Sequence, residues 1–263
     1  MVFIVNWEWK SRVGTHSYRI TAYIRKEGSS MKQKRGRIAE AAWVAAVIIC
    51  GFGVCLSAKS GFGVSMVVAP AYVIYLKISQ ALPWFTFGMA EYCLQGVVII
   101  ILSIVVRRFK WKYPLSFGTA ICYGFALDAW RGVFGTEVYT QMYQRCLACA
   151  AGAVITAFAI ALFLRTYLPQ EGYELVVKEI SDKFNLNMNK VKWIYDCSSL
   201  GTATILMLLL FKRFSFEMIG AGTLIMTVIN TPIIAMFGKI LDSRFEFTSA
   251  FDSFHDNFNK LMN

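Results

Sequence analysis

The stretch that decides the fold is SAKSGFGVSMVVAPAYVIYLK, residues 57–77. It is mostly apolar, yet it carries Gly61 and Gly63 close together and Pro70 in its middle. Glycine lets a backbone bend or approach another backbone closely, and proline removes a hydrogen-bond donor, so a plain membrane-crossing helix would not favour this pattern. A helix over Gly61–Leu76 would be about 24 Å long, shorter than a hydrocarbon core of about 30 Å. We therefore expect a short re-entrant segment.

The remainder of the chain has the composition of an integral membrane protein. Of its 263 residues, 57% are hydrophobic and only 16% are charged, against about 25% charged in soluble domains. Several apolar runs reach roughly 20 residues, the length that spans a bilayer as a helix. We predict an all-α, polytopic transmembrane bundle with about six spans, at Ala39–Ala58, Phe85–Val106, Leu115–Phe134, Cys146–Tyr167, Ile194–Phe211 and Glu217–Ile240.

The positive charge lies mainly at the ends of these spans. The net charge is +11, and basic clusters occur at 32–37 (KQKRGR) and 107–112 (RRFKWK). This is the positive-inside pattern, so we expect the lipid bilayer as a partner and no nucleic acid. A re-entrant segment keeps both clusters on one side, which predicts a cytoplasmic N-terminus, although Lys212 and Arg213 then fall on the other side.

The predicted domains are a basic N-terminal extension at 1–37, a transmembrane domain at 38–241 and a polar tail at 242–263. Residues 1–30 precede Met31 and its basic cluster, and we expect them to be an upstream extension without a function. An amphipathic helix is predicted at about 171–189, on the membrane surface or against the bundle. Its apolar stripe is formed by Tyr173, Val176, Val177, Ile180 and Phe184.

Ionisable groups inside a span are costly and are therefore candidates for function. Glu91 lies about two turns inside a span and shares a helical face with Trp84, Gly88 and Gln95. A carboxylate satisfied by a structural partner is the alternative. Asp128 has the i, i+3 spacing that permits an ion pair with Arg131, which favours a structural role.

Asp196 begins the fifth predicted span and is followed by Cys197, Ser198 and Ser199. A carboxylate and hydroxyl groups at a helix start are typical of an N-cap and of polar contacts between helices. Contact with a ligand is the less favoured reading.

The opening stretch has a loose counterpart in IGAGTLIMTVINTPIIAMFGK, residues 219–239. Both contain Gly-x-Gly, an apolar run, a proline and a final lysine. Broken helices in corresponding positions indicate a transporter's binding site, whereas glycines that only allow close helix crossing are the alternative. The candidate substrate-binding residues are Gly61, Gly63, Ser65, Pro70, Glu91, Gln95, Asp128, Gly220, Gly222, Thr223, Asn230 and Pro232.

Catalytic and metal-binding templates fit poorly. The sequence has no complete G-x-S-x-G motif, no H-E-x-x-H motif and no Walker or dinucleotide fingerprint. Cys146 and Cys149 form a single C-x-x-C, and the two histidines, His16 and His255, lie outside the spans. We therefore expect no enzyme, no cofactor and no metal site.

The two glycine stretches, together with FTFGMAEYCLQG, RRFKWKYPLSF, Tyr123-Gly124 and Leu127-Asp128, resemble the YczE/YyaS/YitT-type family of bacterial membrane proteins. The resemblance covers roughly 31–241 and implies a multi-pass protein of the bacterial cytoplasmic membrane, without an activity or site residues to carry over. We expect a transporter or permease for a small molecule or ion. The alternative is a scaffold or partner subunit that docks through the amphipathic helix. The oligomeric state is left open.

Overall fold

The computed structural model describes residues 35–36, 39–107, 109–166, 168–216 and 218–247. Most of the predicted extension at 1–37 (residues 1–34 and 37) and of the predicted tail at 242–263 (residues 248–263) lies outside the described residues. The described part forms eight helices and two short strands. These are β1 (Arg35–Gly36), α1 (Ala39–Ser60), α2 (Ala69–Ile78), α3 (Phe87–Val106), α4 (Lys112–Phe134), α5 (Met142–Phe163), α6 (Gly172–Phe184), α7 (Met188–Phe211), α8 (Ala221–Arg244) and β2 (Glu246–Phe247).

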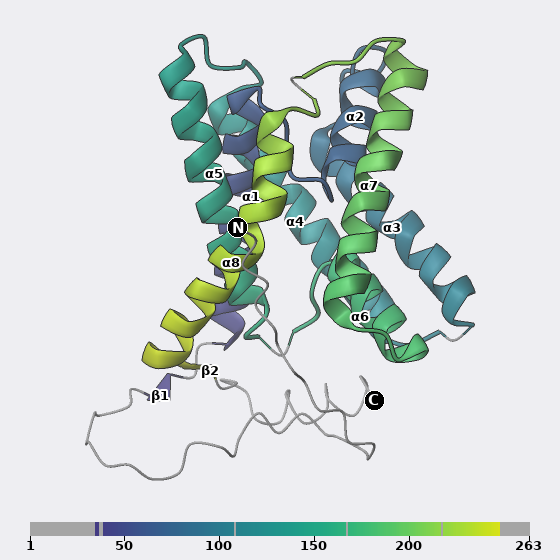
Figure 1. Ribbon diagram of the computed structural model, residues 1–263, viewed down its shortest axis with the longest axis vertical. Coiled ribbons are helices and arrows are strands. Elements are labelled where there is room, and N and C mark those ends of the chain that lie inside the picture. The colour runs from purple at the N-terminus through teal and green to yellow at the C-terminus, as the bar shows by residue number, and fades with distance from the viewer. Residues whose placement is uncertain (1–34, 37–38, 108, 167, 217, 248–263) are drawn as a thin grey trace, which may run out of the picture. The chain divides into compact units, whose positions relative to one another are not determined.

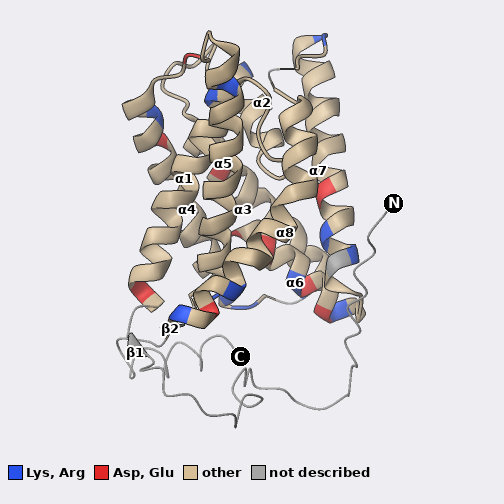
Figure 2. Cartoon of the chain, turned by 60° about the vertical axis from the view of Figure 1, so that its left-hand side comes forward, with Lys and Arg blue, Asp and Glu red and all other residues tan. Residues whose placement is uncertain are grey.

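The bundle has two ends, which the helices connect (Figure 1). β1 and β2 pair in parallel, so the segment that enters α1 and the segment that leaves α8 meet at one end, here called the terminal end. Five helices are long and apolar enough to cross a membrane: α1, α3, α5, α7 and α8. Lys and Arg gather toward the helix ends, and the middle of the bundle is mostly uncharged (Figure 2). The all-α transmembrane bundle predicted from the sequence is confirmed.

α4 is a sixth helix that runs from one end of the bundle to the other. Near its start, Thr119 donates to the Pro169 carbonyl at the terminal end. At its last residue, the Phe134 carbonyl accepts a hydrogen bond from Lys59 at the opposite end. α4 is not among the five helices that are apolar enough to cross a membrane. Its neighbours α1 and α3 cover one side of it, including Tyr123 and Leu127.

The segment 61–78 is re-entrant, as predicted. α1 ends at the opposite end, and residues 61–68 then run into the bundle without forming a helix. α2 is only 10 residues long, starts with Pro70 in its first turn and returns to the opposite end. There Lys77, in its last turn, lies over the ring of Phe211, the last residue of α7.

Three apolar cores hold the bundle together. The first joins the re-entrant segment to α1, α3, α4 and α7, with Val64, Ala69 and Phe87 completely buried. The second lies between α1, α4, α5 and α8. The third fixes α6 to α3 and α4 through residues such as Leu102 and Leu175. α6 is therefore packed against the bundle at the terminal end.

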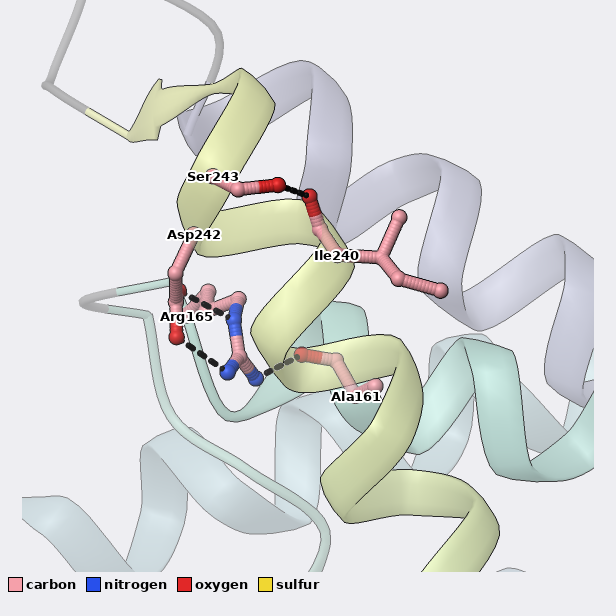
Figure 3. A network of polar contacts seen from close by, with 5 residues as sticks. All are labelled: Ala161, Arg165, Ile240, Asp242 and Ser243. Carbon is pink, nitrogen blue, oxygen red and sulfur yellow. Dashed lines mark hydrogen bonds and ion pairs between the residues drawn. The ribbon is translucent and has the colours of Figure 1, made fainter.

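Helix boundaries differ from the predicted ones in two informative places. Asn185 ends α6 in a left-handed conformation (φ 50°), as expected of an asparagine turn, but α7 then begins at Met188. Asp196 consequently lies inside α7, and its predicted role as an N-cap is wrong. α8 continues past residue 241 to Arg244, and its Asp242 accepts two hydrogen bonds from Arg165 after the end of α5 (Figure 3).

Candidate functional site

The two glycine segments cross each other in direct contact. Gly63 forms an antiparallel bridge with Ile219 and has a positive φ of 91°. A Cβ atom at Gly63 would lie 2.8 Å from the nitrogen of Gly220. A Cβ at Gly220 would lie 2.7 Å from the carbonyl oxygen of Phe62. The glycines are therefore needed because backbone touches backbone, and nothing fits between the segments.

Arg145, at the start of α5, fixes the turn that enters the crossing. Its Nε donates to the Ser60 carbonyl at 2.7 Å, and its Nη2 donates to the Gly61 carbonyl at 2.8 Å. The guanidinium also lies over the Phe62 ring, 4.7 Å from the centroid. Carbonyls at the end of a helix lack partners within the helix, and Arg145 satisfies two of those where α1 gives way to the turn.

Two polar groups at the crossing differ in their surroundings. Thr223 is completely buried, and its hydroxyl has no hydrogen-bond partner. The carbonyl of Ser65 accepts bonds from the backbone nitrogens of Val68 and Ala69, where the turn passes into α2. An apolar groove of about 330 Å³ lies beside the crossing, between α5 and α8, and is lined by residues such as Cys149, Gly222 and Ile225.

The second glycine segment is less broken than its sequence predicts. α8 continues through Pro232, which is exposed and lies about three turns from Gly220. Asn230 has a buried Oδ1 without a partner. The similarity of the two segments predicted two broken helices, and this prediction is wrong for the second segment. The Gly-x-Gly parts of both segments do meet.

Asp128 has a structural role in this arrangement. Its carboxylate accepts from the Thr86 hydroxyl at 2.6 Å and from the Gly88 nitrogen at 2.8 Å, so it helps to cap the start of α3. Arg131 donates to the Tyr75 hydroxyl instead. The local ion pair that their spacing permits is not the arrangement found.

Glu91 and Gln95 form a separate, completely buried polar pair on α3. Gln95 Nε2 donates to Glu91 Oε1 at 3.3 Å, and Gln95 Oε1 accepts from the Gly172 nitrogen at 2.8 Å. Glu91 Oε2 has no hydrogen-bond partner. Trp84, predicted on the same face, precedes α3 and is exposed.

Further ionisable and phenolic groups extend this pair toward the terminal end. Tyr173 is 4% exposed, and its hydroxyl, which lies near Glu91, has no partner within hydrogen-bond geometry. Glu171 is close enough to Glu91 for their charges to interact. Burial raises the pKa of Glu171 to about 8, and the neighbouring charge of Glu174 adds to the rise. We call Glu91, Gln95, Glu171 and Tyr173 the polar cluster.

The structure thus divides the predicted site into separate regions. Gly61, Gly63, Gly220, Gly222 and Thr223 meet at the crossing, with Ser65 and Pro70 in the same re-entrant segment. Glu91 and Gln95 belong to the polar cluster, whereas Asp128 caps α3 and Asn230 and Pro232 lie farther along α8. Ala90, beside Glu91, packs in the same core as Val64 of the re-entrant segment, which is the link between the two regions.

Sequence reasoning missed Glu171 and Tyr173 as site residues. Both stand at the start of the amphipathic helix, in the sequence EGYE, where charged groups are expected to face water. The available signal was Gly172 between them. With no side chain, it lets its backbone nitrogen reach Gln95, and a Cβ there would lie 3.1 Å from Ile99.

Comparison with known proteins identifies the family. The sequence model of the family of unknown function DUF6198 matches residues 38–239, which is most of the chain, and the protein therefore belongs to this family. No curated protein and no solved structure matches the chain. The match leaves the resemblance to YczE/YyaS/YitT-type proteins as a prediction.

Proposed function

Because the family carries no assigned function, we propose one from the residues of this chain. The protein is a transporter or permease of small solutes, not an enzyme, and Glu91 is the group that carries a proton. The observation that supports this proposal is a completely buried carboxyl group in a membrane-crossing helix, with one oxygen lacking any hydrogen-bond partner.

A structural role explains the hydrogen bonding of only one of the two oxygens of this carboxyl group. Gln95 satisfies Oε1, whereas Oε2 and the nearby Tyr173 hydroxyl are both unpaired. Burying a polar group without a partner costs free energy, and ionisable groups inside a membrane protein are commonly found on ion and proton paths. An aliphatic residue could fill the same place without this cost in free energy, which favours a functional reason for Glu91.

The re-entrant segment packs in the same core as the helix that carries Glu91. A rigid-body shift of the re-entrant segment would be felt at Glu91, because Ala90 and Val64 share one core. In transporters, half-length helices near the middle of the membrane form binding sites and gates. We propose that solute passage is linked to such a shift and that protonation of Glu91 biases it.

The proposed orientation places the terminal end in the cytoplasm of a bacterial cell. Among the described residues, this end has more basic side chains than the opposite end, especially in the 107–112 connection and in α6 and the first turns of α7. The opposite end has Lys59, Lys77, Arg131, Arg145, Lys212 and Arg213. The positive-inside rule then sets the N-terminus on the cytoplasmic side.

The alternative function, a scaffold that docks through the amphipathic helix, finds less support. Val176 and Val177 are 5% and 2% exposed, because the apolar stripe of α6 packs against the bundle itself. The stripe is therefore covered along most of its length, with Phe184 at its end 51% exposed, and α6 offers a docking partner mainly its polar face.

The test begins with a ligand screen on the detergent-purified protein, because a bound solute raises the melting temperature by mass action. Solutes that bind are then tested for uptake into proteoliposomes with and without an imposed pH gradient. We expect uptake to respond to the gradient in the wild type and to lose at least about tenfold of that response in Glu91→Gln. Glu137→Gln is the matched control, since Glu137 is exposed in the connection before α5.

Two outcomes would overturn the proposal. Uptake by Glu91→Gln with the pH-gradient response of the wild type would remove the proton role of Glu91. Stoichiometric co-purification of a second protein, without solute binding or uptake by the isolated chain, would favour the scaffold. Glu91→Gln is nearly isosteric, so its melting temperature shows whether a loss of transport reflects misfolding.

A further inference from the structure

The polar cluster leads to a second group of charged residues at the terminal end. Lys192, in the second turn of α7, lies 3.1 Å from Glu174 Oε1 and 3.6 Å from Asp196 Oδ1. The side chains of Lys192 and Glu174 are 32% and 28% exposed, so this triad meets the surface. The triad can therefore exchange protons with water, whereas Glu91 is completely buried.

Glu171 interacts both with the triad and with Glu91. It precedes the first residue of α6, and its own carbonyl accepts from the Leu175 nitrogen at 3.2 Å. Its carboxyl group interacts with Glu174 and Lys192 of the triad and also with Gln95, which donates to Glu91. Gly172, the next residue, is tied to Gln95, which fixes the position of Glu171 relative to α3.

Two unpaired groups show that this cluster is more than a collection of acidic residues. Glu91 Oε2 is completely buried without a partner, and so is the hydroxyl of Tyr173, which lies near the same carboxyl group. A hydroxyl and a carboxyl oxygen that lack partners are free to receive a proton or to pass one on. Both are on the Glu91 side of Glu171.

We propose that Glu171 is a second proton-binding residue, which passes protons between Glu91 and the Glu174–Lys192–Asp196 triad. When a proton moves from the terminal end into the bundle, the protonated Glu171 gives its proton to the Glu91 carboxylate. This leaves Glu171 as a carboxylate and Glu91 neutral. The triad then returns a proton from the surface to Glu171. The role of the receiving group rests on the proposed function of Glu91, whereas proton binding by Glu171 does not.

The charge of Glu171 is set by groups on every helix around it. α3 contributes Glu91 and Gln95, and α7 contributes Lys192. α6 contributes Tyr173 and Glu174. Farther away, Cys50 of α1 and Tyr123 of α4 also interact with the Glu171 charge. Glu174 and Lys192 act on Glu171 in opposite directions, which makes the proposal testable by two variants.

The experiment is an infrared titration of the purified full chain, because a protonated carboxyl group has a carbonyl stretch that a carboxylate lacks. Spectra are recorded from about pH 6 to about pH 10, which brackets the pKa of about 8 for Glu171. We expect one band that disappears in Glu171→Gln. In the wild type this band should titrate near pH 8.

The paired variants show whether the triad controls this proton. Lys192→Met removes a positive charge and should shift the titration of the Glu171 band to higher pH. Glu174→Gln removes a negative charge and should shift it to lower pH. Lys190→Met, which changes an exposed residue two positions earlier, should leave it unchanged.

The possible outcomes separate this proposal from the proposed function. A spectrum of Glu171→Gln identical to the wild type would overturn the proposal, as would equal shifts in Lys192→Met and Lys190→Met. Loss of the pH-gradient response in Glu91→Gln together with normal uptake by Glu171→Gln would remove the transfer role of Glu171. If the Glu171 band titrates as expected but Glu91→Gln transports normally, the proposed function fails and Glu171 still binds a proton.

Discussion

The glycine crossing and the polar cluster are both buried, yet they are built on opposite principles. At the crossing, backbone touches backbone around Gly63 and Gly220, so any added atom must displace the main chain. In the polar cluster, side chains meet other side chains, and hydrogen-bonding groups on Glu91 and Tyr173 are left unpaired. The difference indicates that the crossing supplies shape and the cluster supplies chemistry. The predictions below test this contrast, from the largest expected effect to the smallest.

Gly63→Ala should have the largest effect on folding. Its φ of 91° is strained for any side chain, and the new Cβ would meet Thr223 and the Gly220 nitrogen. Strain and overpacking together should cost about 3 kcal/mol or more of unfolding free energy. The melting temperature in detergent and the yield of monodisperse protein measure this loss. Gly118→Ala is the control, because a Cβ at Gly118 meets nothing within 4 Å. Equal melting temperatures would contradict the close crossing.

Arg145→Met should have the next largest effect. It leaves the Ser60 and Gly61 carbonyls without their charged donor, which should cost about 2–3 kcal/mol. Arg213→Met, at an exposed position of the same end, should cost much less. Proteolysis of the re-entrant turn, compared between the two variants, measures the local effect. Similar cleavage rates would show that Arg145 does not hold the turn.

The stability of the protein should fall as the pH rises through the range set by Glu171. The pKa of this carboxyl is raised from 4.5 to about 8, so between these values the folded state holds a proton that the unfolded state has released. The contribution is therefore complete below about pH 4.5 and is lost as the pH rises to about 8. Melting curves across this range should slope downward, and Glu171→Gln should flatten them. An unchanged slope in that variant would assign the pH dependence to other groups.

Tyr173→Phe should have the smallest effect on stability. Its hydroxyl has no partner, so its removal should change the unfolding free energy by less than about 1 kcal/mol or raise it slightly. The control is Tyr113→Phe, because the Tyr113 hydroxyl donates to Glu179 at 3.4 Å and its loss should be destabilising. A larger loss from Tyr173→Phe than from Tyr113→Phe would mean that the polar cluster is held together by this hydroxyl.

The sequence predicted the crossing better than the cluster, for physical reasons. Two glycines and a proline inside an apolar run restrict the backbone locally, so the break at Gly61–Pro70 could be read directly. The continuous helix through Pro232 could not be predicted in the same way, because neighbouring residues decide whether a proline breaks a membrane helix or is accommodated. Glu91 was evident as a charge in an apolar run. Glu171 was not evident from the sequence, because its burial depends on how α6 packs against α3. Its neighbours in the sequence are also polar.

The bridge between Gly63 and Ile219 also has a consequence in time. Ile219 follows Gly63 by 156 residues, so at about 5–20 residues per second the ribosome needs roughly 8–30 s to supply the second segment. Until then the re-entrant turn exists without its partner. Arg145 is synthesised about halfway through this interval and can hold the turn at Ser60 and Gly61 before α8 arrives. The order of synthesis thus makes Arg145 a temporary support for a structure that the glycines complete.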